Sequence, residues 1–157
     1  MVAKGFKRIW ILRRLKKLGA TEDELKDVYI KQIRSILEYA VPVWHSSITQ
    51  AEKRDIERVQ KAALHVILGM EYTTYSLALK TLNLQTLDIR RDMLCKKFAI
   101  KSSKHSKHKN WFKINEKITT TRQNQPKYCP VYESTTRFEN SPINYLTKLL
   151  INKLKLE

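Results

Sequence analysis

The stretch TQAEKRDIERVQKAALHVILG, residues 49–69, decides the fold class. Its apolar residues recur every three or four positions, which predicts an α-helix with one buried face. Thr49 and Glu52 have the spacing of a capping box at the start of this helix, and Gly69 is suited to a cap at its end. The residues expected on the buried face are Ile56, Val59, Ala63, Val66 and Ile67.

Apolar patterns and cap residues on both sides of this stretch predict five further helices, although the apolar residues of the first are spread round its axis and form no clear stripe. They cover residues 6–18, 21–41, 74–82, 86–101 and 143–154. Pro42 is expected to end the second of these, because proline disfavours the α conformation in the residue before it. Tyr39 and Trp44 flank this proline, and both are expected to fill space in the core between helices. In helix 86–101 the residues expected to face inward are Leu87, Leu94 and Phe98.

The sequence shows no internal repeat, and the chain is long enough for one modest core. We therefore predict an all-α domain over residues 5–101. Residues 102–141 begin with a polar, lysine-rich run and lack a convincing period, which predicts a basic, loosely ordered linker or tail. Residues 142–157 are predicted to contain a short C-terminal helix.

Charge is the most unusual property of the composition, with 31 lysines and arginines against 15 acidic residues and a net charge of +16. Such an excess of one sign repels itself, and an anionic partner commonly offsets it. Nucleic acid is the leading candidate and an anionic membrane surface the second, while a merely basic protein stays open. No helix joins a strongly basic face to a Trp- and Phe-rich face, so no membrane partner is expected.

The cysteine content and the N-terminal stretch bear on the compartment. Cys95 and Cys129 are too few for a disulfide framework or a four-ligand zinc site, and Cys95 is interpreted as a small packing residue. Basic residues interrupt the N-terminal apolar stretch, and no uncharged apolar run is long enough to span a bilayer. We expect an intracellular protein, nuclear or cytoplasmic, that is neither secreted nor membrane-spanning.

Catalytic chemistry has little support in the residue patterns. Nucleotidyl transfer needs carboxylates that hold two metal ions, yet no two aspartates are adjacent, and the acidic residues 22–24 suit the first turn of a helix. Three glycines cannot assemble a phosphate-binding loop. Residues 45–47, His-Ser-Ser, are interpreted as a polar linker, and His105 and His108 as solvated loop residues. No enzyme activity of its own, cofactor, metal or small-molecule substrate is expected.

Nucleic-acid contact is supported first by the helix quoted above. Four of its residues fall at i, i+4, i+7 and i+11, opposite the buried face: Arg54, Arg58, Lys61 and His65. A row of positive charge along one exposed side suits a phosphate backbone. The alternative is an ordinary solvated face, because Glu57 on its flank dilutes the positive field.

A second basic patch is predicted beyond residue 95. Basic groups interleaved with aromatic rings suit single-stranded nucleic acid, because bases stack on rings while cations neutralise phosphates. The same composition suits a disordered tail or a nuclear-import signal, and Trp111 could equally pack on the core. The cluster consists of Lys96, Lys97, Lys101, Lys104, Lys107, Lys109 and Lys113, with His105, His108, Trp111 and Phe112 among them.

Four blocks in order along the chain resemble one known family. They are Leu37–Trp44; Ile48-Thr49 with Glu57–Gln60 and Gly69; residues 75–99 with Tyr75, Ala78-Leu79, Leu82, Leu84, Leu87, Arg90-Arg91, Leu94-Cys95 and Phe98-Ala99; and residues 136–146 with Thr136-Arg137-Phe138, Ser141-Pro142-Ile143 and Tyr145-Leu146. Together they resemble the region downstream of the polymerase core in non-LTR (LINE-type, jockey-like) retrotransposon reverse transcriptases. The resemblance covers nearly the whole chain.

The resemblance implies a small thumb-like helical bundle with an irregular basic C-terminal extension. In this family such a segment follows the palm and is thought to hold the primer-template, here an RNA–DNA hybrid or a DNA duplex. It implies a non-catalytic segment of an RNA-directed DNA polymerase, whose palm and endonuclease are expected elsewhere. The alternatives are a protein-interaction module that packs on a reverse-transcriptase palm, in cis or in trans, or a truncated remnant of a transposable element without independent function.

Overall fold

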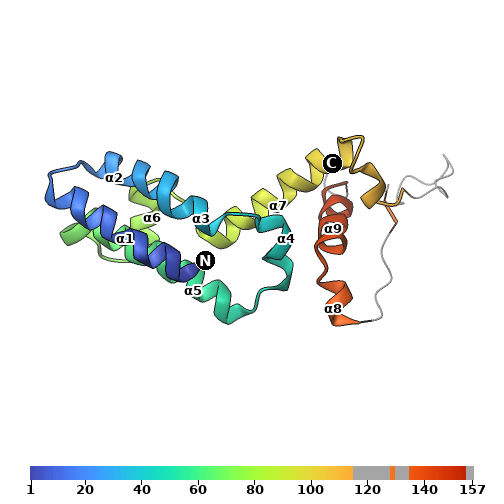
Figure 1. Cartoon of the computed structure of the whole chain (residues 1–157), viewed down its shortest axis with the longest axis horizontal. Helices are drawn as coiled ribbons and strands as arrows, with labels where there is room; N and C mark the ends of the chain where they lie inside the picture. Colours follow the sequence, from blue (N-terminus) through green and yellow to red (C-terminus); the bar gives the residue numbers. More distant parts are fainter. Residues whose placement is uncertain (115–127, 130–134, 155–157) are drawn as a thin grey trace. The chain divides into compact units, whose positions relative to one another are not determined.

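The computed structural model describes residues 1–114, 128–129 and 135–154, and in these residues the chain is all-α (Figure 1). The one isolated bridge described there is antiparallel and pairs Ile114 with Tyr128. No helix in the described ranges is both long enough and apolar enough to cross a membrane. The all-α prediction is confirmed.

The chain divides into two compact units. Unit 1 consists of Met1–Tyr39 and Thr49–Arg90, and unit 2 of Ala40–Ile48 and Arg91–Glu157. Helix α7 (Leu87–Lys104) therefore begins in unit 1 and continues in unit 2. The boundaries expected near residues 101 and 141 both fall inside unit 2.

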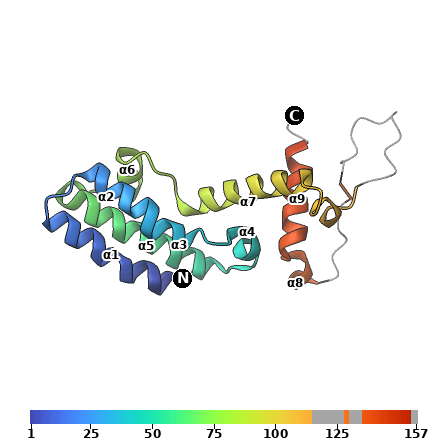
Figure 2. The same ribbon diagram turned by 45° about the horizontal axis from the view of Figure 1, so that its top comes forward.

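Unit 1 is built from α1, the continuous stretch of α2, η1 and α3, and α5. Helix α1 packs along α5, as Figures 1 and 2 both show. A shorter helix, α6, packs on α5. The core is apolar and includes Leu12, Leu25, Ile33 and Leu64, each at most 1% exposed. The elements are α1 (Val2–Lys17), α2 (Glu22–Val28), η1 (Tyr29–Arg34), α3 (Ser35–Leu37), α5 (Gln50–Leu68), η3 (Gly69–Glu71) and α6 (Tyr75–Thr81).

Helix α5 matches its predicted ends. Thr49 is the N-cap, its backbone N–H donates to the Glu52 carboxylate at 2.7 Å, and its hydroxyl accepts from the Glu52 N–H at 3.3 Å. Gly69 follows with φ of +61°, a conformation that favours glycine. Four of the five residues expected on the buried face are at most 3% exposed, whereas Val66 is only half-buried.

The second helix ends differently from the prediction. It contains a π-helical turn, η1, and stops at Leu37, after which Ala40 adopts a left-handed φ of +51°. Pro42 does not end it. Instead Pro42 lies in the first turn of α4 (Val41–Trp44), where a missing backbone N–H costs nothing. Tyr39 is 78% exposed, so its expected core position is wrong, whereas Trp44 packs against the core of unit 2 as predicted.

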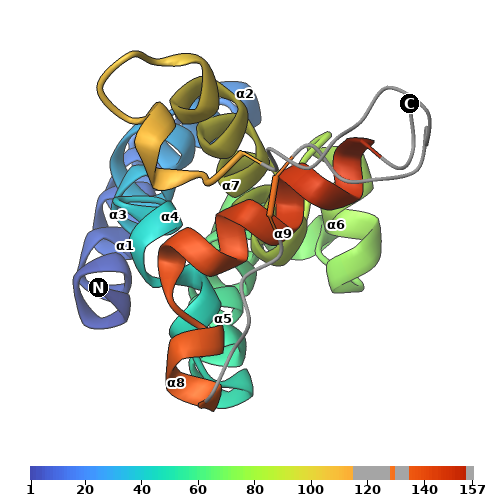
Figure 3. The same ribbon diagram turned by 90° about the vertical axis from the view of Figure 1, so that its right-hand side faces the viewer.

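Unit 2 packs α9 against α4 and the 3-10 turn η2, as Figure 3 shows for α4 and α9. Its core consists of Val41, Cys95, Ala99, Phe112, Tyr128, Leu146 and Leu150. Its elements, besides α4 and the later part of α7, are η2 (His45–Ser47), η4 (Lys109–Trp111), α8 (Thr136–Glu139) and α9 (Pro142–Leu154). Helix α8, capped by Thr135, lies in a stretch where the sequence shows no helical period.

Helix α7 runs three residues beyond its predicted end, and some of the residues on its buried side differ from those predicted. Leu87 is buried as predicted, and Leu94 and Phe98 are half-buried against the core of unit 2. The other fully buried positions are Arg91, Cys95, Ala99 and Ser102. Cys95 is therefore a packing residue, as predicted, while the burial of the arginine was not foreseen.

Candidate nucleic-acid interface

The basic row of α5 is exposed from end to end. Arg58 has a side chain 72% exposed and pairs with Asp55 at 3.2 Å, while the Lys61 ammonium lies 5.0 Å from the centre of the Tyr75 ring. Exposed contacts of these kinds are weak, so neither cation is held strongly by its neighbour within the chain. The four exposed residues of the row are those predicted: Arg54, Arg58, Lys61 and His65.

Glu57, which was expected to dilute this row, is turned into unit 1. Its carboxylate accepts a hydrogen bond from the Tyr75 hydroxyl and another from the Leu87 backbone N–H at 3.3 Å. Burial, together with this carboxylate, raises the pKa of Tyr75, so the phenol stays a neutral donor. The negative charge of Glu57 therefore serves the packing of α5 on α6 and α7.

A groove of about 380 Å³ lies beside the basic row in unit 1. Phe6 of α1 borders it and is 41% exposed, and Tyr72 borders it after α5 ends. The Tyr72 ring lies 5.0 Å from the His65 ring, so the histidine is held against an aromatic face. The groove is lined by Phe6, Arg58, Lys61, Ala62, His65 and Tyr72.

The two aromatic residues of this groove were missed by sequence reasoning. Phe6 was assigned to a helix without a clear apolar stripe, and Tyr72 lies in a short connection between helices. A signal for Phe6 was present, because Phe6, Trp10 and Lys17 recur at i, i+4 and i+11. No local pattern marks Tyr72, whose position depends on the course of the chain after Gly69.

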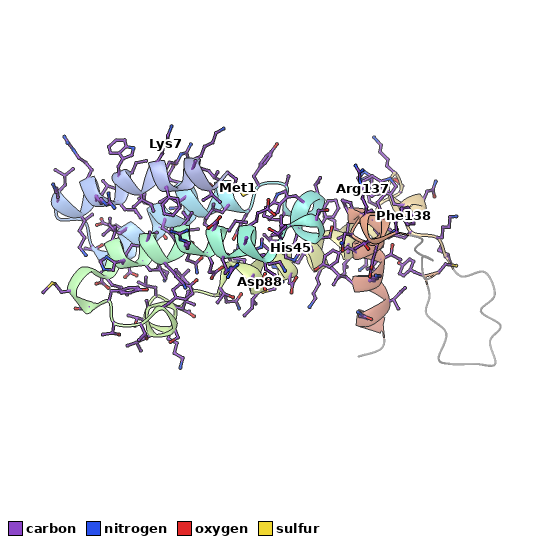
Figure 4. The ribbon with its side chains drawn as sticks, turned by 90° about the horizontal axis from the view of Figure 1, so that it is seen from below. Met1, Lys7, His45, Asp88, Arg137 and Phe138 are labelled. Carbon is purple, nitrogen blue, oxygen red and sulfur yellow. The ribbon has the colours of Figure 1, made fainter. Side chains whose placement is uncertain are left out.

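Helix α1 adds further positive charge to unit 1. Figure 4 shows Lys7 projecting outward from α1, and Arg8 donates to the carbonyl oxygen and the side chain of Gln32 at 2.9 and 3.1 Å. Lys16 is different, because its ammonium donates to the Val66 and Ile67 carbonyls at 2.9 and 2.7 Å. It therefore caps the C-terminal end of α5, where a cation is favourable. The exposed basic residues of α1 are Lys4, Lys7, Arg8, Arg13, Arg14 and Lys17.

The second predicted patch lies in unit 2, on the later part of α7 and the turn after it. The lysines at 97, 101 and 104 form one row, on the side of the helix opposite the buried Cys95 and Ala99. Lys109 lies in η4, and its side chain is outside the part of the chain that the structure describes. The exposed lysines here are Lys96, Lys97, Lys101, Lys104, Lys107 and Lys113.

Three rings stack beside these lysines. The His105 and His108 ring centres lie 4.8 Å apart, and those of His108 and Trp111 lie 4.4 Å apart, with both pairs nearly parallel. Trp111 is 42% exposed, whereas Phe112 is 2% exposed and joins the core. Phe112, rather than Trp111, therefore packs inward.

His45 is a buried residue, which corrects its interpretation as part of a polar linker. Its Nε2 lies 2.8 Å from an Asp92 carboxylate oxygen, which also accepts from the Tyr145 hydroxyl at 3.0 Å. The hydroxyls of Ser46 and Ser47 donate to the Asn140 carbonyl at 2.7 and 3.2 Å, so these serines bond to α8's end and not to the imidazole. The arrangement holds the elements of unit 2 together.

Two further observations concern the reactive side chains of the described residues. Burial, with the Asp92 carboxylate nearby, raises the pKa of the Cys95 thiol to about 12, so it stays protonated and unreactive at neutral pH. Residues 1–114, 128–129 and 135–154 contain no group of three His, Cys, Asp or Glu side chains able to hold a metal ion. No protein-family model, curated protein or solved structure matches this chain significantly.

Proposed function

We propose that this chain is a non-catalytic segment that binds nucleic acid through the phosphate backbone, of the kind that follows the palm in non-LTR retrotransposon reverse transcriptases. Its partner would be an RNA–DNA hybrid or a DNA duplex, met in the nucleus or cytoplasm. The observation that carries this proposal is the exposed row on α5, whose flanking carboxylate Glu57 is turned inward. The lysine row on α7 and the net charge of +16 support it.

The expected mode of binding follows from these residues. Lysines and arginines on a helix face reach phosphate oxygens and neutralise them without reading base edges, so little sequence specificity is expected. If about six phosphates are neutralised, affinity should fall roughly a thousandfold between about 50 and 200 mM salt. Polymerisation is not expected of this chain alone, because the palm that carries the chemistry would lie elsewhere.

Fluorescence anisotropy of a labelled RNA–DNA hybrid, titrated with the protein across a salt series, tests the proposal. The double variant Arg58→Gln/Lys61→Gln removes two cations of the row and should reduce the slope of log affinity against log salt by about 1.8. The control Lys31→Gln/Lys80→Gln removes the same charge from exposed positions on η1 and α6. Equal losses in both variants would mean that only net charge matters, and no binding at low salt would contradict the proposal.

A second candidate is a module that packs on a polymerase palm. Two apolar side chains of α7, Ile89 and Met93, are 53% and 36% exposed and lie one helical turn apart. Ile100, further along α7, packs against the core of unit 2 and does not extend this pair. Salt-insensitive self-association at low concentration that disappears in Ile89→Ser/Met93→Ser would favour this candidate. If neither binding nor association is found, the remnant without independent function is favoured.

A further inference from the structure

Exposed aromatic side chains on α1 are not explained by contact with a phosphate backbone. Trp10 is 61% exposed and Phe6 is 41% exposed, although both belong to a well-packed helix. They belong to a row that follows the buried row of α1 by one position and contains Phe6, Trp10, Arg13 and Lys17. Exposed aromatic rings offer faces on which a ligand with flat rings can stack.

Phe6, the first residue of this row, borders the same groove as the basic row of α5. A Cβ on Gly5 would lie 3.0 Å from a Val59 methyl, and Lys16 bonds to the carbonyls of Val66 and Ile67, so α1 and α5 run in the same direction in close contact. Phe6 lines the groove together with Arg58 and Lys61. Because residues four apart lie on one side of a helix, Trp10 follows Phe6 by one turn on the same side of α1, beyond the residues that line the groove.

The helical rise between Phe6 and Trp10 is close to the separation that one base sandwiched between two rings needs. Residues at i and i+4 of a helix are separated by about 6 Å along its axis. One base sandwiched between two rings needs about 7 Å, since bases in a stacked strand repeat about every 3.4 Å. A duplex hides the faces of its bases, whereas a single strand exposes them to rings. The occupant that contacts the rings as well as the basic row is therefore an unpaired strand, whereas a duplex would contact the basic row alone.

We infer that the α1–α5 groove of unit 1 binds single-stranded nucleic acid, with the backbone neutralised by Arg58 and Lys61 and with bases stacked on Phe6 at the groove and on Trp10 one turn further along α1. This inference rests on the proposed function, because the two cations belong to the α5 row. It adds that unit 1 prefers an unpaired strand to a paired one. The groove discriminates unpaired from paired nucleic acid, and it does so without reading base identity.

The test compares a labelled oligo(U) of about 12 nucleotides with a blunt RNA–DNA hybrid, using the full chain. Trp10→Ala is expected to weaken oligo(U) binding by about 5- to 100-fold, since a stacked base contributes on that scale. Blunt-hybrid binding should change by less than about twofold. Tyr39→Ala is the matched control, because Tyr39 is a 78% exposed aromatic residue of unit 1 that lies after α3 and not on α1 or α5, and it should leave both affinities unchanged.

Tryptophan emission gives an independent readout. The chain has three tryptophans, and Trp111→Phe leaves Trp10 as the exposed one and Trp44 as a half-buried one. Stacking of a base on Trp10 is expected to quench emission when unlabelled oligo(U) is added, and Trp10→Phe should abolish the quenching while retaining most of the affinity. Absence of quenching in a chain that binds oligo(U) would overturn the inference.

The outcomes separate this inference from the proposed function. Oligo(U) binding that depends on Arg58 and Lys61 but not on Phe6 or Trp10 would overturn the inference and leave backbone binding intact. Equal weakening of hybrid and single strand by Trp10→Ala would also overturn it, because the rings would then act on packing alone. Displacement by polyglutamate as effective as by oligo(U) would point to an acidic protein partner instead. Binding of neither nucleic acid at low salt would overturn both proposals.

Discussion

Gln60 of unit 1 and His45 of unit 2 are both buried polar side chains, but their hydrogen bonds are satisfied to different degrees. In unit 1, Gln60 is 1% exposed, accepts from the Tyr29 hydroxyl at 2.6 Å, and donates to the Tyr75 hydroxyl at 3.0 Å and the Gln85 carbonyl at 2.9 Å. In unit 2, His45 is 6% exposed and has its bond to Asp92, while its Nδ1 has no hydrogen-bond partner among the described residues.

The difference indicates that buried polar contacts contribute more to the packing of unit 1 than to that of unit 2. The Gln60 amide joins α5 to η1, α6 and the segment before α7, so a loss there leaves several buried groups without partners. Burial is the main cause that raises the pKa of Tyr29, which keeps its phenol a neutral donor to Gln60. In unit 2 the apolar cluster around Cys95 carries more of the packing, and Asp92 is 45% exposed, so water can replace its partner.

The largest effect is expected from Gln60→Leu. The substitution replaces the amide by an apolar side chain of similar size. It leaves the Tyr29 hydroxyl and the Gln85 carbonyl without their partner, and each such group costs about 1–3 kcal/mol. We expect the free energy of unfolding to fall by about 3 kcal/mol in urea denaturation followed by circular dichroism. Gln50→Leu, at an exposed position of the same helix, is the control. A loss below about 1 kcal/mol would mean that the network contributes little.

A smaller loss is expected when the cation that caps α5 is removed. Lys16→Met retains the apolar stem but leaves the Val66 and Ile67 carbonyls without their donor, which should cost about 1–2 kcal/mol in the same assay. Lys17→Met removes the same charge from an exposed neighbour and should change stability by less than about 0.5 kcal/mol. Equal effects of both substitutions would assign the loss to net charge and not to the cap.

His45→Leu should have a smaller effect than Gln60→Leu, which tests the comparison directly. The Tyr145 hydroxyl still donates to the Asp92 carboxylate, which is also partly open to water, so only about 1 kcal/mol is expected. The measurement is the urea midpoint of unit 2, read in a Trp10→Phe/Trp111→Phe background from the emission of Trp44, which packs on its core. A loss as large as that of Gln60→Leu would show that both units depend on their polar contacts equally.

The features that were predicted correctly from the sequence are those that depend on contacts between residues close together in the chain. The ends of α5 were correct because Thr49, Glu52 and Gly69 act within a few residues of the helix they bound. The exposed row on α5 was also predictable, since helical periodicity alone puts Arg54 and Lys61 away from the buried face.

What the sequence did not reveal depends on residues far apart in the chain. Lys16 meets the end of α5 some 50 residues later, and Gln60 meets Tyr29 across 31 residues. The exposed Tyr39 was misplaced because a local period does not show that the second helix stops at Leu37. The groove beside α5 was missed for the same reason, as one of its walls comes from α1.

The last and smallest effect concerns pH and the capping box that starts α5. Hydrogen bonds from Thr49, chiefly its backbone N–H, lower the pKa of Glu52 below its ordinary value of 4.5. A carboxyl whose pKa is lower in the folded chain stabilises it at pH above the ordinary value, and this contribution is lost as pH falls through the folded-state pKa. The stability difference between the wild type and Glu52→Gln should therefore shrink from about pH 6 to about pH 3. Glu71→Gln, at an exposed glutamate in η3, is the control, and a difference for Glu52→Gln that stays constant over this range would contradict the assignment.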